Sequence, residues 1–343
     1  MKRTCLVAFC VLIVFPMMSH AGYVSSRWDM SIGGHVKFDM GWADQDVNAD
    51  YRRASRKGTR EDKYSCIYTA GGDTRMHWRI KGPDGLGAKT AALVEGDFRG
   101  VTRTSYGTFG LRHSYMTLEW EKTKLLIGHT WRPWGRVPTY STFLLGYNDL
   151  LPFTMGGLRL PQISLTQKLS KEFALTIGAT YPTNPLGENK PNSYTLGMIP
   201  HFSADLTYKT DKYGKIGRWM TEFGISGVVG REKRTFEVSP GILDDDIVES
   251  WGFLVKGFVP IISQNKENKA GALGISFNIW TGQNVPVYLS DFPASYDRGN
   301  HKYVAPVITG GWSHLQYWLT NKISCNVGYG YAVSKLSDAY RQQ

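Results

Sequence analysis

The main part of this 343-residue chain lacks any long hydrophobic run. A membrane-spanning helix needs about 20 mostly apolar residues, yet no 18 consecutive apolar residues occur beyond residue 21. Long stretches with helical periodicity are also missing from the sequence. The sequence therefore excludes a transmembrane helix in residues 22–343 and leaves strands as the expected secondary structure.

Cysteine is scarce, and the motifs of common catalytic and cofactor sites are missing. Of four cysteines, Cys5 and Cys10 lie in the N-terminal segment, and Cys66 and Cys325 remain. Two cysteines cannot build a disulfide framework, so we expect both to be free thiols. The sequence has no P-loop, no HExxH or GxSxG motif and no Cys/His cluster at zinc spacing. It therefore predicts neither an enzyme nor a cofactor.

The first 21 residues differ from the rest and predict a secretory signal peptide. Lys2 and Arg3 form a basic start, Thr4–Met18 is apolar, and Ser19 and Ala21 are small residues at a cleavage site. The signal peptide holds two of the 40 basic residues and none of the 29 acidic ones, so residues 22–343 carry a formal net charge of +9. A positive exported protein suggests anionic partners.

Alternation of apolar and polar residues is the dominant pattern of residues 22–343. In the first such segment, apolar Met30, Ile32, Val36 and Phe38 alternate with polar residues such as Lys37. Successive side chains of a strand point to opposite faces, so the segment has one apolar and one polar face. About 13 segments show the pattern: 30–41, 69–81, 88–99, 109–120, 125–131, 158–169, 172–181, 194–208, 218–231, 247–259, 270–281, 304–319 and 322–333. This repetition is typical of transmembrane β-barrels.

In one segment the alternation does not separate polar from apolar residues cleanly. In residues 109–120, Arg112 falls on the same face as apolar Met116, Leu118 and Trp120. The alternation alone leaves the direction of the Arg112 side chain open.

The connections between segments alternate between short and long. The short ones are 82–87, 121–124, 170–171, 209–217, 260–269 and 320–321; the long ones are 42–68, 100–108, 132–157, 182–193, 232–246 and 282–303. Outer-membrane barrels have short periplasmic turns and long extracellular loops, whereas a soluble sandwich has no reason to keep this order. Asp244–Asp246, in one long connection, could hold a divalent cation or could simply be solvated.

The third long connection is unusually apolar. The stretch Leu125–Gly157 starts like a strand, and residues 132–157 then lack a strand period while including Trp134, Tyr140 and Phe143. Loops of this length inside a compact domain are usually functional. We expect this loop to fold into the lumen of a barrel and narrow it; the alternative is a loop packed on the outside of a soluble β-domain.

Thirteen strands do not close a barrel of this class, because such barrels have an even strand number. Either a short strand is missing from the list of segments, or the chain lacks its last C-terminal strands. The end at Gln343, where such barrels usually end in an aromatic residue, favours missing C-terminal strands.

Four stretches carry a resemblance to a known family. They are VEGDFRG (94–100), LRHSYMTLEW (111–120), IGHTWRPWG (127–135) and KISCNVGYGY (322–331). They resemble the trimeric outer-membrane porin superfamily, especially DcaP-like porins, over most of residues 22–343. The resemblance implies a 16-stranded antiparallel barrel in the bacterial outer membrane, a homotrimer, a third extracellular loop in the lumen and passive uptake of small, often anionic solutes. DcaP-like proteins typically carry an N-terminal helical extension, for which residues 22–27 are too few.

The polar faces of the predicted strands and the third loop supply a set of pore charges. The basic residues expected to line the lumen are Lys37, Arg75, Arg79, Lys81, Arg99, Arg132 and Arg136. Rings of Arg and Lys favour anions in a pore, and guanidinium groups suit carboxylate and phosphate. The acids expected on the opposite side of the channel are Glu95, Asp97 and Asp149. The alternative for each residue is that it braces the loop or merely solvates the lumen.

The sequence thus predicts one all-β outer-membrane barrel over residues 22–343, which passes small hydrophilic solutes with a bias to anions such as dicarboxylates. Small anionic or polar solutes and membrane lipid are the expected partners, with no nucleic acid and no metal. A structural or adhesion-type barrel with a plugged lumen is the alternative. A barrel hydrolase with a Ser-His-Asn site has no specific motif in its favour.

Overall fold

The structure of the chain is a computed structural model, which describes residues 29–37, 39–43, 58, 66–70, 74–98, 109–133, 159–181, 193–239, 241–284, 295–297 and 302–335. Every regular element in these residues is a β-strand. None of the described residues form a helix long and apolar enough to cross a membrane. The predicted signal peptide, residues 1–21, lies outside the described residues and stays a prediction.

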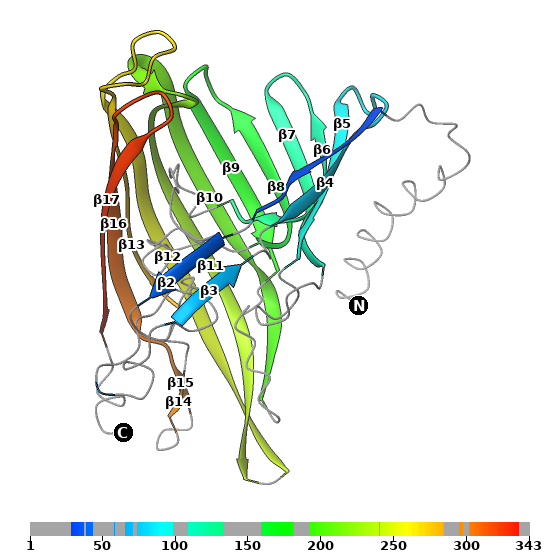
Figure 1. Ribbon diagram of the computed structural model, residues 1–343. Coiled ribbons are helices and arrows are strands. Elements are labelled where there is room, and N and C mark those ends of the chain that lie inside the picture. Colours follow the sequence, from blue (N-terminus) through cyan, green and yellow to red (C-terminus); the bar gives the residue numbers. More distant parts are fainter. Residues whose placement is uncertain are drawn as a thin grey trace.

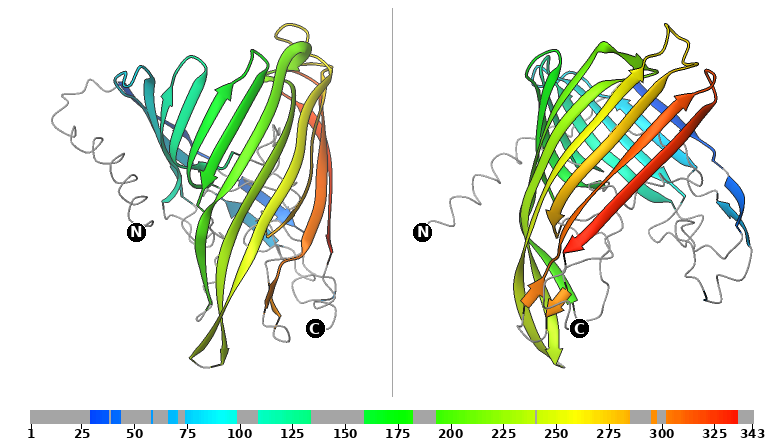
Figure 2. Two further views of the ribbon diagram at one scale, coloured as in Figure 1. Left: turned by 180° about the vertical axis from the view of Figure 1, so that it is seen from behind. Right: turned by 90° about the vertical axis from the view of Figure 1, so that its left-hand side faces the viewer.

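Thirteen strands form one antiparallel sheet, in which each strand pairs with its neighbours along the chain. They are β1 (Asp29–His35), β4 (Arg75–Lys81), β5 (Lys89–Asp97), β6 (Gly110–Glu119), β7 (Thr123–Trp131), β8 (Arg159–Lys168), β9 (Phe173–Thr180), β10 (Ser193–Ile216), β11 (Trp219–Ser239), β12 (Ile242–Ile262), β13 (Leu273–Gln283), β16 (Val307–Trp318) and β17 (Ser324–Lys335). Each of the 13 predicted segments overlaps one of these strands, which confirms the all-β prediction. Among the described ladders, β1 and β17 are the two edges of the sheet. The sheet curves strongly, so one face is concave and the other convex (Figures 1 and 2).

Burial in this sheet is the reverse of burial in a water-soluble sheet. On β13, Ile279 is 60% exposed on the convex face, whereas its neighbour Asn278 is 0% exposed on the concave face. The same holds on β10, where Phe202 is 51% exposed and His201 is 2% exposed. Large apolar side chains cover the outside, and buried polar side chains lie on the inside together with an apolar cluster of Val228, Leu254, Trp280 and Ile308. A soluble protein rarely exposes so continuous an apolar surface, whereas a membrane barrel requires one.

The first predicted strand, 30–41, is interrupted. It consists of β1 and β2 (Asp39–Ala43), and its partner consists of β3 (Cys66–Ala70) and β4. β2 pairs with β3 in a small sheet of its own. At the break, the Lys37 backbone N–H donates to Thr74 Oγ1 at 3.1 Å, and the Thr74 hydroxyl donates to the Lys37 carbonyl at 3.2 Å. These two bonds join the hairpin across its break.

The predicted long connection 232–246 is wrong. β11 runs to Ser239 and β12 starts at Ile242, so the two strands form a continuous hairpin that projects beyond the rest of the sheet (Figure 1). Both strands have 21 residues, and β10 has 24. Asp244–Asp246 therefore lies in a strand rather than a loop, and Lys233 forms an ion pair with Asp245 at 2.5 Å. No group of metal-binding side chains occurs in the described part of the chain.

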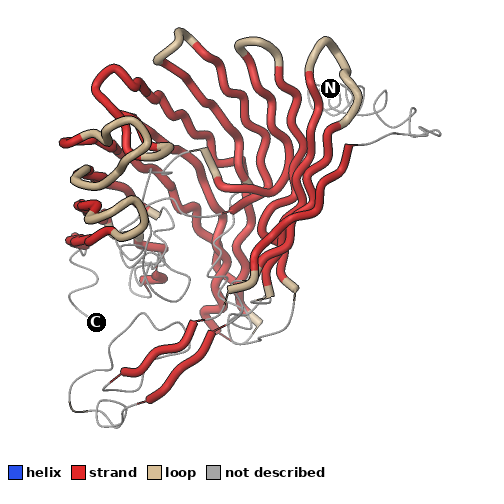
Figure 3. Tube along the Cα trace, turned by 45° about the horizontal axis from the view of Figure 1, so that its top comes forward, coloured by secondary structure: helices blue, strands red, loops and turns tan. Residues whose placement is uncertain are grey.

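The other connections keep the predicted alternation of short and long, although residues 209–216 of the predicted connection 209–217 belong to β10. Short turns join β4–β5, β6–β7, β8–β9, β10–β11, β12–β13 and β16–β17, and they gather at one end of the sheet (Figure 3). The longer connections 98–109, 132–158, 181–192 and 284–306 leave from the other end, and the last of these contains the hairpin of β14 (Ser295–Asp297) and β15 (Lys302–Val304). The exposed Cys325 is a free thiol, as expected.

Candidate functional site

The basic residues predicted on the first strands lie together on the concave face. In the ladders, His35 pairs with Arg75, Ser31 with Arg79 and Asp29 with Lys81. Residues that are paired directly point to the same face, so Arg75, Arg79 and Lys81 form one row along β4. The Lys81 ammonium forms an exposed ion pair with Asp29 at 2.8 Å. Lys37 lies half-buried at the end of β1.

The two predicted acids of this region do not lie across the channel. Asp97 on β5 pairs directly with Arg75, and Glu95 pairs with His77. Glu95 and Asp97 therefore belong to the same wall as the basic row, and their expected position opposite it is wrong. The register of adjacent strands places them there, because the hairpin of β4 and β5 aligns the polar positions of both segments.

One guanidinium group holds both acids. Arg112 donates through Nε to Glu95 Oε1 at 3.0 Å and through Nη1 to Asp97 Oδ2 at 2.7 Å. The side chains of Arg112, Glu95 and Asp97 are only 10%, 18% and 6% exposed. Hydrogen bonds between ionised groups are roughly twice as strong as neutral ones, so the two bonds of Arg112 link this triad tightly.

A β-bulge gives Arg112 its direction. The ladder between β5 and β6 pairs Glu95 with His113 and the next residue, Gly96, with Leu111, so Arg112 is the additional residue. A bulge places two residues of one strand opposite one residue of the other. Arg112 and His113 are consequently both buried, at 8% exposure each. The bulge resolves the ambiguous phase of segment 109–120.

The cluster continues toward the start of the third long connection. His113 Nδ1 and Thr130 Oγ1 are 2.8 Å apart. The His113 ring meets the Trp131 ring edge to face, with centroids 6.1 Å apart. The Arg159 guanidinium lies over the same indole at 4.6 Å. The charged wall and the point at which the chain leaves β7 are thus at the same level.

At that point the chain turns onto the concave face. A Cβ atom at Gly178 would come within 2.7 Å of Pro133 Cγ and 3.2 Å of Ser164 Cβ. Gly178 shares its face with the buried Ser203 and Ser164, its partners in the neighbouring strands. Pro133 therefore packs against the inside of the sheet, and the absence of a side chain at Gly178 makes this approach possible. Arg132, which precedes it, is 2% exposed.

Arg132 and Pro133 help to line a polar cavity of about 430 Å³, to which strands from β7 to β12 also contribute. Two ion pairs lie in its wall. Lys256 Nζ and Asp205 Oδ2 are 2.6 Å apart and almost fully buried, and Lys209 Nζ and Glu222 Oε2 are 3.3 Å apart. Thr207 and Ser226 also donate to the Asp205 carboxylate.

Sequence reasoning missed Arg112, Asp205 and Lys256. Asp205 and Lys256 each occupy a polar position in an alternating segment, and charged residues in membrane-spanning segments are expensive and usually functional. The sequence therefore contained a signal for Asp205 and for Lys256. Arg112 was hidden by the bulge, which alternation does not reveal. The predicted site residues Arg99, Arg136 and Asp149 lie outside the described residues, as does most of the third long loop.

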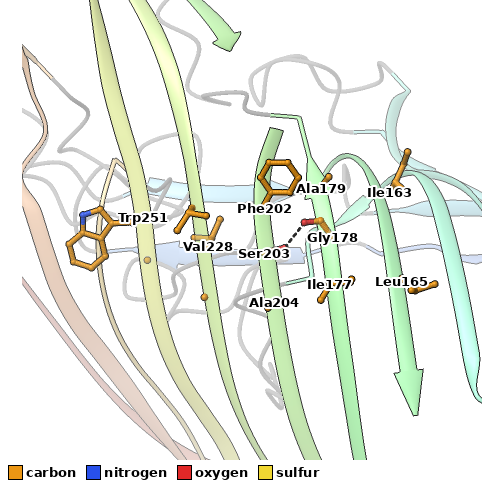
Figure 4. A pocket seen from close by; sticks show the side chains of 13 residues that line it. Ile163, Leu165, Ile177, Gly178, Ala179, Phe202, Ser203, Ala204, Val228 and Trp251 are labelled. Atoms are coloured by element: carbon orange, nitrogen blue, oxygen red, sulfur yellow. Dashed lines mark hydrogen bonds between the residues drawn. The ribbon is translucent and has the colours of Figure 1, made fainter. Parts of the chain in front are cut away.

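The convex face offers a different kind of surface. A hollow of about 700 Å³ crosses β8 to β12 and is lined mostly by apolar groups, including Ile163, Ile177 and Phe202 (Figure 4). Small Ala179 and Ala204 form part of its floor. Hydrocarbon is the environment that suits such a surface.

Comparison with known proteins gives structural matches only. No family model and no curated protein matches the chain. The outer membrane channel DcaP of Acinetobacter baumannii has a TM-score of 0.70 at 17% identity, covering 91% of this chain and 81% of that one. OmpT expressed in the outer membrane of Vibrio cholerae has a TM-score of 0.51 at 11% identity, covering 91% and 78%. The chain therefore has the β-barrel fold of outer-membrane channels such as DcaP, in agreement with the resemblance of its motifs.

Proposed function

We propose that this chain is a porin of the bacterial outer membrane. It lets small hydrophilic solutes diffuse passively, prefers anions such as dicarboxylates, and works as a homotrimer. The observation that carries the proposal is the reversed burial of a curved 13-stranded sheet, with Ile279 and Phe202 exposed outside and a charged wall inside. An outer surface of this kind suits lipid, and an inner surface of this kind suits water and ions.

The preference for anions rests on the basic row and the loop. Arg75, Arg79 and Lys81 follow one another along the concave face of β4. Arg132 lines the polar cavity of the same hollow. Guanidinium and ammonium groups lower the energy of a passing anion and raise that of a cation. Arg99 and Arg136, which are also predicted to line the lumen, would add to this positive potential.

The plugged barrel remains a second candidate because of one observation. Several polar side chains of the concave face are almost completely covered, including Asn278 at 0%, Arg132 at 2% and His201 at 2% exposure. A lumen filled by its own loops would give such values as well. A narrow open pore and a plug differ in one measurable property, which is ion conductance.

Planar-bilayer recording tests the proposal. The purified full chain should produce stepwise current increases in KCl, and a KCl gradient should give a reversal potential of the sign for anion preference. Absence of current from correctly folded protein would contradict the porin proposal and favour the plugged barrel. A cation-selective reversal potential would contradict the anion preference only.

A further inference from the structure

Arg112 occupies an unusual position among the charges of the concave face. It is the one additional residue of the bulge between β5 and β6, and it binds two carboxylates of the neighbouring strand at 3.0 and 2.7 Å. Neither Glu95 nor Asp97 is more than 18% exposed as a side chain. Since all three groups are largely buried, Arg112 acts on the lumen through the charges it compensates more than through direct contact with a solute.

The triad lies at the level where the third long connection begins. His113, next to Arg112, contacts Thr130 at the end of β7, and Arg132 and Pro133 then turn over the concave face. Arg132 and Pro133 thus occupy part of the hollow at this level. A charge near a narrow passage acts on every ion that passes.

The local charge depends on Arg112. With Arg112 present, the adjacent Glu95, Asp97, Arg75 and Arg112 balance to zero formal charge. Without it, the same group has a charge of −1 next to the basic row of β4. The one uncompensated carboxylate charge would then offset the charge of Arg79, which stands on the same wall.

We propose that Arg112 is a specificity-determining residue, which keeps the pore anion-preferring by neutralising Glu95 and Asp97 in the wall. This inference rests on the proposed porin function. It assigns selectivity to a residue that holds wall carboxylates, in addition to the basic residues that face the solute.

The experiment compares reversal potentials of full-length variants across a KCl gradient. Arg112→Met should raise the permeability ratio of K⁺ to Cl⁻ by about two- to fivefold, the effect of one unit charge within a Debye length of the ion. Arg112→Lys should stay close to the unmodified protein. The double variant Arg112→Met/Asp97→Asn, which loses one positive and one negative charge, should also return close to it.

A matched control removes one positive charge from a different part of the sheet. Arg231→Met breaks an exposed ion pair with Glu249 on the projecting hairpin, where the two side chains are 56% and 65% exposed. Its permeability ratio should remain unchanged. A shift equal to that of Arg112→Met would contradict the inference, because net charge alone would then explain both.

The remaining outcomes separate the inference from the proposed function. An unchanged permeability ratio in folded Arg112→Met overturns the role of Arg112 and leaves the porin intact. If that variant does not fold, the double variant Glu95→Gln/Asp97→Asn decides: it must increase anion preference, and an unchanged ratio overturns the inference. Absence of current from the unmodified protein overturns the porin proposal and this inference together.

Discussion

The two ends of the sheet line the same hollow with different chemistry. β4, β5 and β6 place Arg75, Glu95 and Arg112 on the concave face. β13, β16 and β17 contain a single charged residue, Lys335, and present amides and indoles such as Asn278, Gln316 and Trp312. One wall is held by ion pairs and the other by uncharged groups. The difference teaches that polarity of the lumen and charge of the lumen are separate properties of this fold.

The buried ion pairs predict the largest effect of substitution. Lys256→Met would leave Asp205 buried at 5% exposure without its cation. Removing one partner of a buried pair costs about 3 to 5 kcal/mol of unfolding free energy. Urea unfolding of the protein in lipid vesicles measures this loss. The double variant Lys256→Met/Asp205→Asn should recover most of it, and equal stability of the single variant and the unmodified protein would contradict the pairing.

The start of the third loop predicts a smaller loss. Gly178→Val adds a side chain where a Cβ atom would already lie 2.7 Å from Pro133 Cγ. Overpacking of this kind costs about 1 to 3 kcal/mol, and the same urea experiment measures it. The control is Gly227→Ala on the convex face, where the nearest atom would be 3.7 Å away. Similar losses in both variants would mean that Pro133 does not rest on the inner wall.

A substitution in the uncharged wall should change the unfolding free energy still less. Asn278 is fully buried, and its Nδ2 and Oδ1 atoms have no hydrogen-bond partner in the structure as described. Replacing an unpaired amide by an apolar group of similar shape is nearly neutral, so Asn278→Leu should change the unfolding free energy by less than about 1 kcal/mol. A loss as large as that of Lys256→Met would show that both walls depend on polar pairing and would remove the contrast between them.

A substitution in a turn outside both walls should change the stability least. A hydrogen bond from Lys212 lowers the pKa of Glu172 in the turn between β8 and β9. A lowered folded-state pKa adds stability above the unfolded-state pKa and loses it as the pH falls through the folded-state value. The small stability difference between the unmodified protein and Glu172→Gln should therefore persist above the unfolded-state pKa of about 4.3 and shrink as the pH falls below it. A difference that grows on acidification would contradict the pairing.

Alternation predicted most of the membrane-spanning part of the fold. In the proposed membrane barrel, segments such as 270–281 have water on one side and lipid on the other, so the polarity of each residue indicates its face. The same rule failed for residues 232–246, because a strand that leaves the bilayer has water on both faces. There the ladder continues through cross-strand pairs such as Arg231 with Glu249 at 2.9 Å, which alternation does not show.

The candidate site was predicted less completely than the fold. The basic row of β4 followed from alternation alone, because Arg75, Arg79 and Lys81 are separated by even numbers of positions. The partner of Glu95 did not, since one bulged residue turns Arg112 to the opposite face. The contact of Pro133 with Gly178 joins two strands that are not neighbours in the sheet, and no local pattern encodes it.

The proposed function requires that the concave face lines an open, water-filled pore. Its most direct test is single-channel current from Arg79→Cys in a background with Cys66→Ser and Cys325→Ser, before and after a charged thiol reagent. Arg79 lies on the concave face, and the matched position Ile279→Cys lies on the convex one. The account predicts a stepwise fall in conductance for Arg79→Cys and no change for Ile279→Cys. Absence of channels, or conductance that is unchanged at Arg79→Cys after confirmed modification, would contradict it.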